Sequence, residues 1–483
     1  MTQARFDTEG ELTLVLSGTG ARPARAELVG PRARVSATLT GRGKTWRAVF
    51  PLRASKWGGP ELPLPTGEYA VVVVPSSEAE SSSPVDDVPL ATGALLRAEL
   101  RDGVVHVGPP LDPAYDSGEG QAALERRYAT RTTPLENAVF FESFYGRNAG
   151  CNPLAIDREL ARVAPDVVRY WSVVDHSVVV PDGAVAVVEG SPEWWRARGA
   201  ARLLVVNDWL RRRFARRPGQ RVLQTWHGTP LKRLALHRPG FDPRRMLAVA
   251  RESLRWNVLL AQNAYAERIL RKAYAFLRRP IWVEGYPRND VLVTGDGIGI
   301  RRMLGIGDDE RVLLYAPTWR DDRSEMVDFL DPAAFARETD AVVLVRGHSR
   351  TLLPGRDVEG PRVIDVTGFP DTAQLLLAAD ALITDYSSVM FDFSVTGRPM
   401  YFLVPDIEHY RGELRGFYFD LARHAPGPLL GSASDLVEAI RHGDPGEFAE
   451  RYERWRARFN SRDDGAAAER VVARILDQGF VER

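Results

Sequence analysis

Cysteine, lysine and long apolar runs are nearly absent from this sequence of 483 residues. Cys151 is the single cysteine, which excludes an intrachain disulfide and a cysteine-rich metal cluster and fits a reducing compartment. Lysine occurs at only four positions, so arginine supplies most of the positive charge, as a GC-rich coding sequence would also produce. No segment approaches the roughly 20 uninterrupted apolar residues of a membrane span. The N-terminal stretch MTQARFDTEGELTLVLSG lacks the apolar core of a signal peptide.

An excess of charge of either sign is also missing, because 64 basic residues balance 64 acidic ones. This balance argues against a protein that simply coats nucleic acid. The length allows two or three domains, and the 44% hydrophobic content is ordinary for a globular chain with sizeable cores.

The first part of the chain, from about Glu11 to Gly108, alternates apolar and polar residues in short runs separated by Gly, Pro and Ser. This pattern is typical of antiparallel strands and predicts a small β-sandwich-like domain over residues 1–110. Ser76–Pro89 is Ser- and Pro-rich and is expected to be an exposed loop. No catalytic cluster is visible here, which favours an accessory or docking domain.

After a Gly-, Pro- and charge-rich linker over 111–135, short apolar runs alternate with amphipathic stretches, as in βα units on a parallel sheet. The series pauses near Thr294–Gly299 and then resumes. We therefore expect an α/β fold with two consecutive Rossmann-type domains, over 136–290 and 291–483. Ligands should bind at the carboxyl ends of the strands and across the cleft between the domains.

Polar side chains follow four of these expected strands directly. In chain order they are His227; Thr318 and Arg320; Arg346 and His348; and Asp385, Ser387 and Ser388. Because the carboxyl ends of parallel strands converge on one crevice, four such clusters in one chain indicate an active site.

The same segments resemble a known family, the CDP-glycerol glycerophosphotransferases, which include teichoic-acid primases and polymerases. The similarity covers about Asn137 to Pro428. It depends on FESFYG followed by NP, TWHGTPLK, EGYPRND, YAPTWR, VRGHS, TDYSSVMFDF, and RGFYFD followed by PGP. The resemblance implies a GT-B-like pair of Rossmann domains facing a cleft. It also implies transfer of glycerol phosphate from CDP-glycerol to a hydroxyl of a membrane-anchored acceptor, with release of CMP.

Such a reaction needs a base for the acceptor hydroxyl, and by resemblance the base is His227. Imidazole has an unperturbed pKa near 6.5 and can be neutral at physiological pH. The alternative is a structural histidine bonded to a turn carbonyl. Gly228 would allow a sharp turn or a close approach to substrate, and Thr229 followed by Pro230 is typical of a helix N-cap and first helical position.

The reaction also needs cationic and donor groups around the diphosphate. Arg346 and His348 could supply a cation and an imidazole donor, and the resemblance makes His348 a second catalytic candidate. Ser387 and Ser388 should lie near a helix N-terminus and could bind phosphate. Asp385 could cap that helix, bind a ribose hydroxyl or hold a metal. Thr318, Arg320 and Arg415 carry lower weight. Arg415 resembles a family arginine that contacts phosphate, and a structural salt bridge is the alternative.

The stretch from Arg196 to Arg233 carries eleven basic residues and one acidic residue. Apolar residues within the stretch and directly before it could anchor it on anionic lipid, namely Trp194, Trp195, Trp209, Leu210 and Phe214. The alternative is a solvated helix face. The lipid-linked acceptor favours a peripheral location on the cytoplasmic face of the membrane.

Two other functions stay open. The same scaffold could use CDP-ribitol or a nucleotide sugar, and a non-catalytic polyanion- or lipid-binding protein would need neither histidine. No His/Asp ligand set has clear metal spacing, so we expect no tightly held metal and no cofactor.

Overall fold

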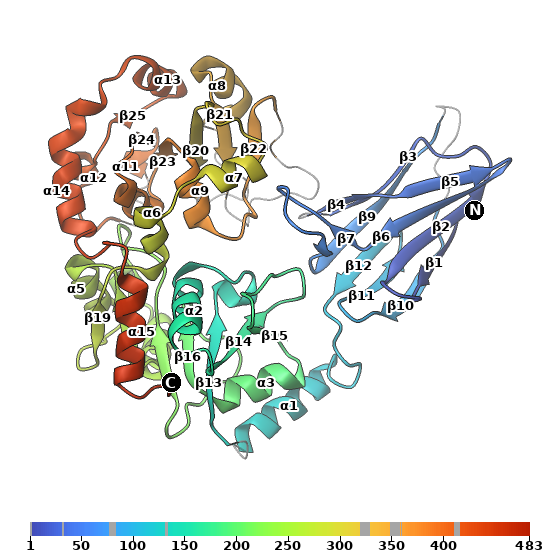
Figure 1. Ribbon diagram of the computed structural model, residues 1–483, viewed down its shortest axis with the longest axis horizontal. Coiled ribbons are helices and arrows are strands. Elements are labelled where there is room, and N and C mark those ends of the chain that lie inside the picture. Colours follow the sequence, from blue (N-terminus) through green and yellow to red (C-terminus); the bar gives the residue numbers. More distant parts are fainter. Residues whose placement is uncertain are drawn as a thin grey trace.

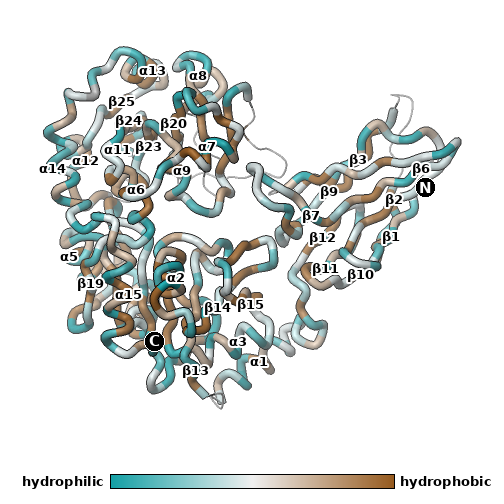
Figure 2. The backbone as a smooth tube through the Cα atoms, viewed as in Figure 1, coloured by the Kyte–Doolittle hydropathy of each residue, from teal (hydrophilic) through white to brown (hydrophobic). Residues whose placement is uncertain are grey.

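The computed structural model describes residues 2–30, 33–76, 84–130, 134–318, 329–347, 358, 360–409 and 416–483. It has three parts: a β-rich N-terminal domain on one side and two α/β lobes stacked beside it (Figure 1). Hydrophobic segments, brown in Figure 2, gather along the strands inside each lobe. Each lobe therefore has its own core around its own sheet.

The N-terminal domain consists of antiparallel strands, as the alternating pattern predicts. As far as the described residues extend, its sheets have the orders β1-β2-β6-β5, β10-β11-β12-β9-β3-β4 and β7-β8. Side chains from the two larger sheets, among them Phe50 of β6 and Leu28 of β3, belong to one buried cluster. The strands are β1 (Gln3–Asp7), β2 (Thr13–Thr19), β3 (Arg25–Val29), β4 (Arg34–Ser36), β5 (Thr38–Arg42), β6 (Thr45–Pro51), β7 (Arg53–Ala54), β8 (Leu62–Pro63), β9 (Gly67–Val74), β10 (Val88–Thr92), β11 (Arg97–Arg101) and β12 (Val104–Gly108).

The first lobe is a parallel sheet of seven strands within the described chain, in the order β15-β14-β13-β16-β17-β18-β19. The strands are β13 (Glu136–Glu142), β14 (Val168–Val173), β15 (Val185–Val188), β16 (Ala201–Val206), β17 (Arg221–Gln224), β18 (Val258–Ala261) and β19 (Ile281–Val283). Its helices are α1 (Gly118–Thr130), α2 (Cys151–Val163), α3 (Pro192–Ala200), α4 (Pro243–Arg255) and α5 (Ala264–Ala273). The short helix α6 (Asp290–Thr294) comes next and packs on the core of the second lobe through Leu292. Helix α1 lies inside the segment expected to be a linker.

The second lobe is also a parallel sheet, and its six described strands run in the order β22-β21-β20-β23-β24-β25. They are β20 (Val312–Ala316), β21 (Val342–Val345), β22 (Val363–Asp365), β23 (Ala381–Thr384), β24 (Met400–Leu403) and β25 (Leu429–Leu430). The helices are α7 (Ile298–Met303), α8 (Pro332–Thr339), α9 (Thr372–Ala378), α10 (Val389–Phe393), α11 (Ile407–His409), α12 (Leu421–His424), α13 (Ala433–His442) and α14 (Ala449–Phe459), and α15 (Ala467–Asp477) follows them in the chain. The predicted α/β fold with parallel sheets is confirmed.

In both sheets the strand order reverses beside the first strand, between β13 and β16 in one lobe and between β20 and β23 in the other. Loops that leave adjacent strands in opposite directions open a crevice at such a point, where ligands of doubly wound sheets bind. The topology therefore places two crevices, one at the carboxyl end of each sheet.

The last helix, α15, leaves the second lobe and packs on α2 of the first. Its Val471, Val472 and Ile475 join the core of the first lobe. The carboxylate of Asp290 accepts hydrogen bonds from the first amides of this helix, Ala467 at 2.9 Å and Ala468 at 2.7 Å. The chain thus crosses between the lobes twice, and the boundary at residues 290 and 291 stays a prediction.

The apolar side chains expected to anchor the basic stretch on a membrane are mostly buried. Trp194, Trp195, Leu210 and Phe214 are at most 7% exposed and belong to the core of the first lobe. That prediction was wrong because alternating charge and aromatic residues do not reveal which face a neighbouring element covers. Among the helices that the structure describes, none combines the length and the apolar character needed to cross a bilayer.

Candidate active site

A cavity of about 620 Å³ lies between the two lobes at the carboxyl ends of both sheets. The first lobe contributes the loops that follow β13, β17 and β19, and the second lobe the loops that follow β20, β21, β22 and β23. Of the predicted site residues, the cavity lining includes His227, Gly228, Thr229, Thr318, Arg346, Ser387 and Ser388. The two crevices that the topology creates therefore open into one shared space.

His227 follows β17 and lies on the first-lobe side of this cavity. Its Nδ1 is 2.6 Å from the carbonyl oxygen of Asn207. A carbonyl can only accept, so Nδ1 carries the proton and donates it, and Nε2 is the basic nitrogen. The ring stacks on Trp226, with centroids 4.7 Å apart, and Phe144 covers it at 5.6 Å. Tautomer and ring plane are both fixed.

Burial lowers the pKa of His227 below its ordinary value, against the raising effects of Asp208 and of the hydrogen bond to Asn207. The imidazole is therefore neutral at physiological pH, with Nε2 free to accept a proton. The hydrogen bond to a carbonyl matches the structural alternative, but it uses only one ring nitrogen. The ring still lines the cavity, so this structural bond is compatible with a basic Nε2, and the role of His227 as the general base stays a prediction.

Asn207, which the sequence analysis missed, holds that carbonyl in place. It follows β16 and is completely buried. Its side-chain oxygen accepts from the amide of Phe144 at 2.9 Å, and its amide group donates to the hydroxyl of Ser143 at 3.1 Å. The loops after β13 and β16 are thereby joined. Asn207 directly follows a buried strand, so the strand-end rule that selected His227 could also have found it.

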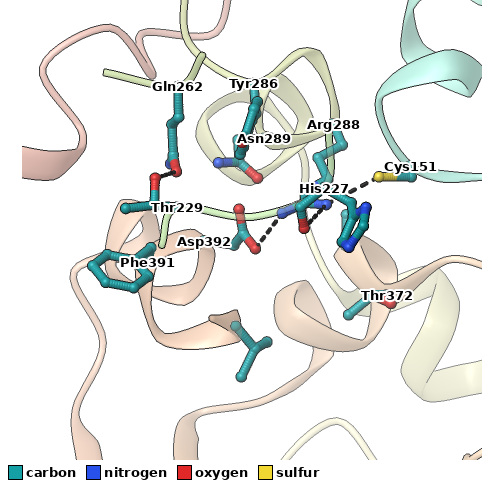
Figure 3. A network of polar contacts seen from close by, with 12 residues as sticks. Cys151, His227, Thr229, Gln262, Tyr286, Arg288, Asn289, Thr372, Phe391 and Asp392 are labelled. Carbon is teal, nitrogen blue, oxygen red and sulfur yellow. Dashed lines mark hydrogen bonds and ion pairs between the residues drawn. The ribbon is translucent and has the colours of Figure 1, made fainter. Parts of the chain in front are cut away.

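Arg288, in the EGYPRND segment, was also missed as a site residue and links the lobes (Figure 3). Its guanidinium donates to the carbonyl of His227 at 3.0 Å, to Cys151 Sγ at 3.0 Å and to Asp392 Oδ2 at 2.7 Å. Burial opposes its charge, but Asp392 and its other neighbours outweigh burial and hold the pKa of Arg288 above its ordinary value. Arg288 is thus a permanent cation beside the His227 loop.

Gly228 lies at the contact between the lobes, whereas Thr229 is bonded within the first lobe. A Cβ on Gly228 would lie 2.7 Å from Ser388 Oγ, so only glycine allows this approach. Thr229 is 1% exposed, and its hydroxyl donates to Gln262 at 2.5 Å and accepts from Asn263 at 3.1 Å. The N-cap expected at Thr229 and Pro230 is wrong, because the chain continues in bends and an isolated bridge from Lys232 to Phe417. Their direct role toward substrate stays a prediction.

In the second lobe, Asp385 does what Asn207 does in the first. It is 3% exposed, and its two oxygens accept from the amide of Thr318 at 2.9 and 3.0 Å. The loops after β20 and β23 are thereby joined at the reversal of strand order. Asp385 thus has a structural role, because it connects the two loops, and its contact with ribose or metal stays a prediction.

Ser387 and Ser388 precede α10, which begins at Val389, and both are partly exposed. Their position at a helix start agrees with the sequence. The Ser388 side chain does not cap the helix. It lies close to Gly228 instead, so this loop is adjacent to the His227 loop at the edge of the cavity.

Arg346 follows β21 on the same side. It donates to the carbonyls of Val366 and Phe369, both at 3.1 Å, and to the hydroxyl of Thr372 at 2.9 Å. Burial lowers the pKa of Arg346 to about 10, against the attraction of Asp371. Arg346 is therefore still charged at neutral pH, and carbonyls and a hydroxyl orient it. Arg320, His348 and Arg415 lie outside the described residues, and their roles stay predictions.

In the part of the chain that the structure describes, no group of three or more His, Cys, Asp or Glu side chains could hold a metal ion. The reading of Asp385 as a metal ligand gains no support from its surroundings, since its oxygens accept backbone amides.

Comparison with known proteins adds a family and a structural match. Residues 127–477 match the family model described as CDP-Glycerol:Poly(glycerophosphate) glycerophosphotransferase. The chain is 35% identical to a teichoic acid poly(glycerol phosphate) polymerase of Bacillus subtilis, covering 72% of this chain but 50% of that protein. It is 34% identical to a teichoic acid glycerol-phosphate transferase of Staphylococcus aureus, covering 71% of this chain and 94% of that protein. The chain thus spans about half the length of the first of these relatives.

Among solved structures, the wall teichoic acid polymerase TagF is similar with a TM-score of 0.68 and 32% identity. The match covers 74% of this chain and 94% of that one. A TagF variant soaked with CDPG is similar with a TM-score of 0.67 and 30% identity, over 75% of this chain and 98% of that one.

The contact between Gly228 and Ser388 gives a test of the lobe interface. We expect Gly228→Ala to lower the free energy of unfolding by about 1–3 kcal/mol, because the new methyl group would overpack the close approach to the Ser388 side chain. Urea denaturation would measure the loss.

Ser388→Gly in the same chain should restore more than half of that loss, because it removes both atoms that the methyl group meets. A Gly228→Ala variant as stable as the wild type, or a double variant that shows only summed losses, would contradict this account of the interface.

Proposed function

Because this chain belongs to the CDP-glycerol:poly(glycerophosphate) glycerophosphotransferase family, we propose that it transfers glycerol phosphate from CDP-glycerol to a hydroxyl group of a membrane-anchored, teichoic-acid-like or capsular acceptor. The products are a phosphodiester and CMP. The observation that carries the proposal is one cavity with a neutral histidine of fixed tautomer on one side and an arginine and a serine-rich helix start on the other. These groups match the two demands of the reaction.

His227 acts as the general base. The acceptor oxygen attacks the phosphorus that bears the glycerol, and its proton passes to Nε2 of His227. The bond from that phosphorus to the CMP oxygen breaks, and CMP leaves with the electron pair. The carbonyl of Asn207 stabilises the imidazolium that forms, because it keeps accepting from Nδ1.

The donor diphosphate lies on the second-lobe side. Arg346 supplies positive charge where negative charge moves toward the leaving CMP, and Ser387 and Ser388 offer hydroxyl donors beside the start of α10. His348 and Arg415 are proposed to add donors there. In this proposal the chain forms a GT-B-like pair of domains. Residues 136–290 bind the acceptor and face the membrane, and residues 291–483 bind CDP-glycerol. The N-terminal sheets are proposed to be a β-sandwich that serves as an accessory domain.

A surface of the first lobe is proposed to contact the membrane from the cytoplasmic face. We define the α4 patch as the exposed apolar side chains Phe241, Met246, Leu247, Leu254 and Leu277, of which Phe241 is 85% and Leu254 is 67% exposed. Arg244 and Arg251 are exposed on the same helix. Beside its end, a cavity of about 550 Å³ is lined by Arg216, Arg221 and Arg279. Apolar side chains among arginines suit a surface of anionic lipids.

The first prediction from this proposed function concerns the reaction. The purified protein, given a lipid-linked glycerol phosphate primer, should release CMP from CDP-glycerol but not from CDP-ribitol, and UDP from no UDP-sugar. His227→Ala should lower the rate by about 10²–10⁴-fold, because the base is lost. Chromatography of released nucleotides measures both.

Omission of the primer is the control, since release should depend on the acceptor. Release of CMP from CDP-ribitol alone would keep the mechanism and change the polymer. Absence of acceptor-dependent release from every donor would overturn the proposal in favour of a lipid- or polyanion-binding protein.

The second prediction concerns pH. Since burial lowers the pKa of His227, the base form should persist below the ordinary histidine pKa of about 6.5. As pH falls through the lowered value, Nε2 gains a proton and kcat/KM should fall in proportion. A profile of kcat/KM against pH should therefore inflect below about 6.5.

His176 and His237 provide matched controls, because burial lowers the pKa of each of them as well. His176→Gln and His237→Gln should keep the acid limb of the profile. An inflection above about 6.5, or one that disappears in either control, would rule out His227 as its source.

The third prediction concerns the membrane. Replacing Leu247 and Leu254 together by Asn should weaken binding to phosphatidylglycerol vesicles by about tenfold or more, because two side chains lose their burial in the interface. Vesicle co-sedimentation measures the affinity. Leu90→Asn, at a side chain 48% exposed on β10, is the matched control and should bind as the wild type does. Equal binding by all three proteins would exclude the α4 patch.

A further inference from the structure

The N-terminal domain lies outside the residues that match the family, yet it contacts both lobes. The contacts come from one segment, residues 53–66, which contains the β7-β8 pair and the turn between them. We call it the brace hairpin. In Figure 1 it projects from the β-rich domain toward the second lobe.

The tip of the brace hairpin packs on the second lobe through Trp57. Its indole Nε1 donates to the carbonyl of Asp365, the last residue of β22, at 2.8 Å. Its ring meets Phe369 edge-on, with centroids 5.5 Å apart, and packs on the core of that lobe. A Cβ on Gly368 would lie 3.1 Å from the indole. Trp57 thus touches three residues of the stretch from 365 to 369.

The tip itself has an unusual backbone. Trp57 has φ 54° and Gly58 has φ 67°, both in the left-handed region. For a bulky residue this conformation costs about 1–2 kcal/mol, so contacts must hold it. A Cβ on Gly58 would lie 2.6 Å from the carbonyl oxygen of Met303, which shows how closely the tip meets the end of α7. The tip is therefore docked in a specific geometry.

The stretch that Trp57 contacts also orients Arg346. The guanidinium of Arg346 donates to the carbonyls of Val366 and Phe369, and the amide of Gly347 donates to the hydroxyl of Thr367 at 2.9 Å. Pro370 and Asp371, which come next, line the cavity between the lobes. One short loop, 366–371, therefore has Trp57 on one side and the cavity arginine on the other.

The base of the brace hairpin reaches the first lobe. The amide of Thr66 donates to Asp175 Oδ2 at 2.7 Å, and Asp175 follows β14 and is 3% exposed. Its other oxygen accepts from the amide of Ser177 at 3.0 Å, so this anchor is itself rigid. The hairpin thus spans from one lobe to the other beside the cavity.

We propose that the brace hairpin holds loop 366–371 in place against the first lobe, and that Trp57 is thereby a positioning residue for Arg346. Its effect on donor binding rests on the function proposed above, whereas its effect on the loop does not. Trp57 is not among the described residues that line the cavity. It sets where the cation that meets the diphosphate lies, so the N-terminal domain contributes to the site without entering it.

Amide hydrogen exchange of the full-length protein without ligand tests the loop directly. Trp57→Ala should raise exchange across 363–376 by about tenfold, since one hydrogen bond and one aromatic contact are lost. Trp57→Phe keeps a ring but cannot donate, and should give a smaller rise. Leu90→Ala, on β10, is the control and should leave this stretch unchanged.

The other end of the hairpin gives a sharper test. Asp175→Ala, in the first lobe, should also raise exchange across 363–376 in the second. The double variant Asp175→Ala with Trp57→Ala should be no faster than Trp57→Ala alone, because losing either anchor releases the same brace. If the two contacts acted independently, the increases in exchange from the two substitutions would add in the double variant.

Calorimetric titration with CDP-glycerol, without acceptor, tests the consequence for donor binding. We expect the Kd for CDP-glycerol to rise about tenfold in Trp57→Ala. In the CMP-release assay with acceptor, KM for CDP-glycerol should rise with little change in kcat, because the variant loses binding of the donor and not the chemical step. If the wild type does not bind CDP-glycerol, the proposed function fails, and the exchange experiment still decides the brace. Unchanged exchange across 363–376 in folded Trp57→Ala, or in Trp57→Phe if the former does not fold, would overturn it.

Discussion

The arrangement of the two lobes depends on the hydrogen bonds that the buried guanidinium of Arg288 makes to both of them. A buried cation is tolerated only where its donors are matched, and Arg288 finds its acceptors on both sides of the cleft. From the first lobe it takes the carbonyl of His227, and from the second it takes the carboxylate of Asp392. Asp392 lies on α10, the helix that Ser387 and Ser388 precede. Arg288 therefore ties His227, the proposed base, to the helix that follows the loop proposed to bind phosphate.

Each lobe also solves the same local problem in the same way. Where the strand order reverses, two loops leave the sheet and their backbone amides need acceptors. In the first lobe Asn207, after β16, accepts from the amide of Phe144, after β13. In the second lobe Asp385, after β23, accepts from the amide of Thr318, after β20. In the first lobe, the carbonyl of the ordered Asn207 orients the ring of His227. In the second lobe, the ordered loop places Thr318 in the lining of the cavity.

Much of this organisation was predictable from local pattern. Alternation with period two located the antiparallel strands, and buried runs followed by polar residues located the strand ends that meet in the cavity. The failures share one cause. Thr229 looks like a helix cap and Trp194 looks like a membrane anchor when only neighbours in sequence are considered. Partners distant in sequence decided both, since Thr229 bonds Gln262 and Trp194 packs in the core of the first lobe.

The sequence by itself determined the α/β architecture, the family and the position of His227 at a strand end, because periodicity and ordered motifs are properties of neighbouring residues. Tertiary structure alone decided which nitrogen of His227 is basic, since the carbonyl that selects it belongs to Asn207, twenty residues away. It also decided that Arg288 joins the lobes and that Trp57 of the N-terminal domain packs beside the loop of Arg346. Such contacts form only when the chain has folded, because their geometry depends on the packing of whole sheets against one another.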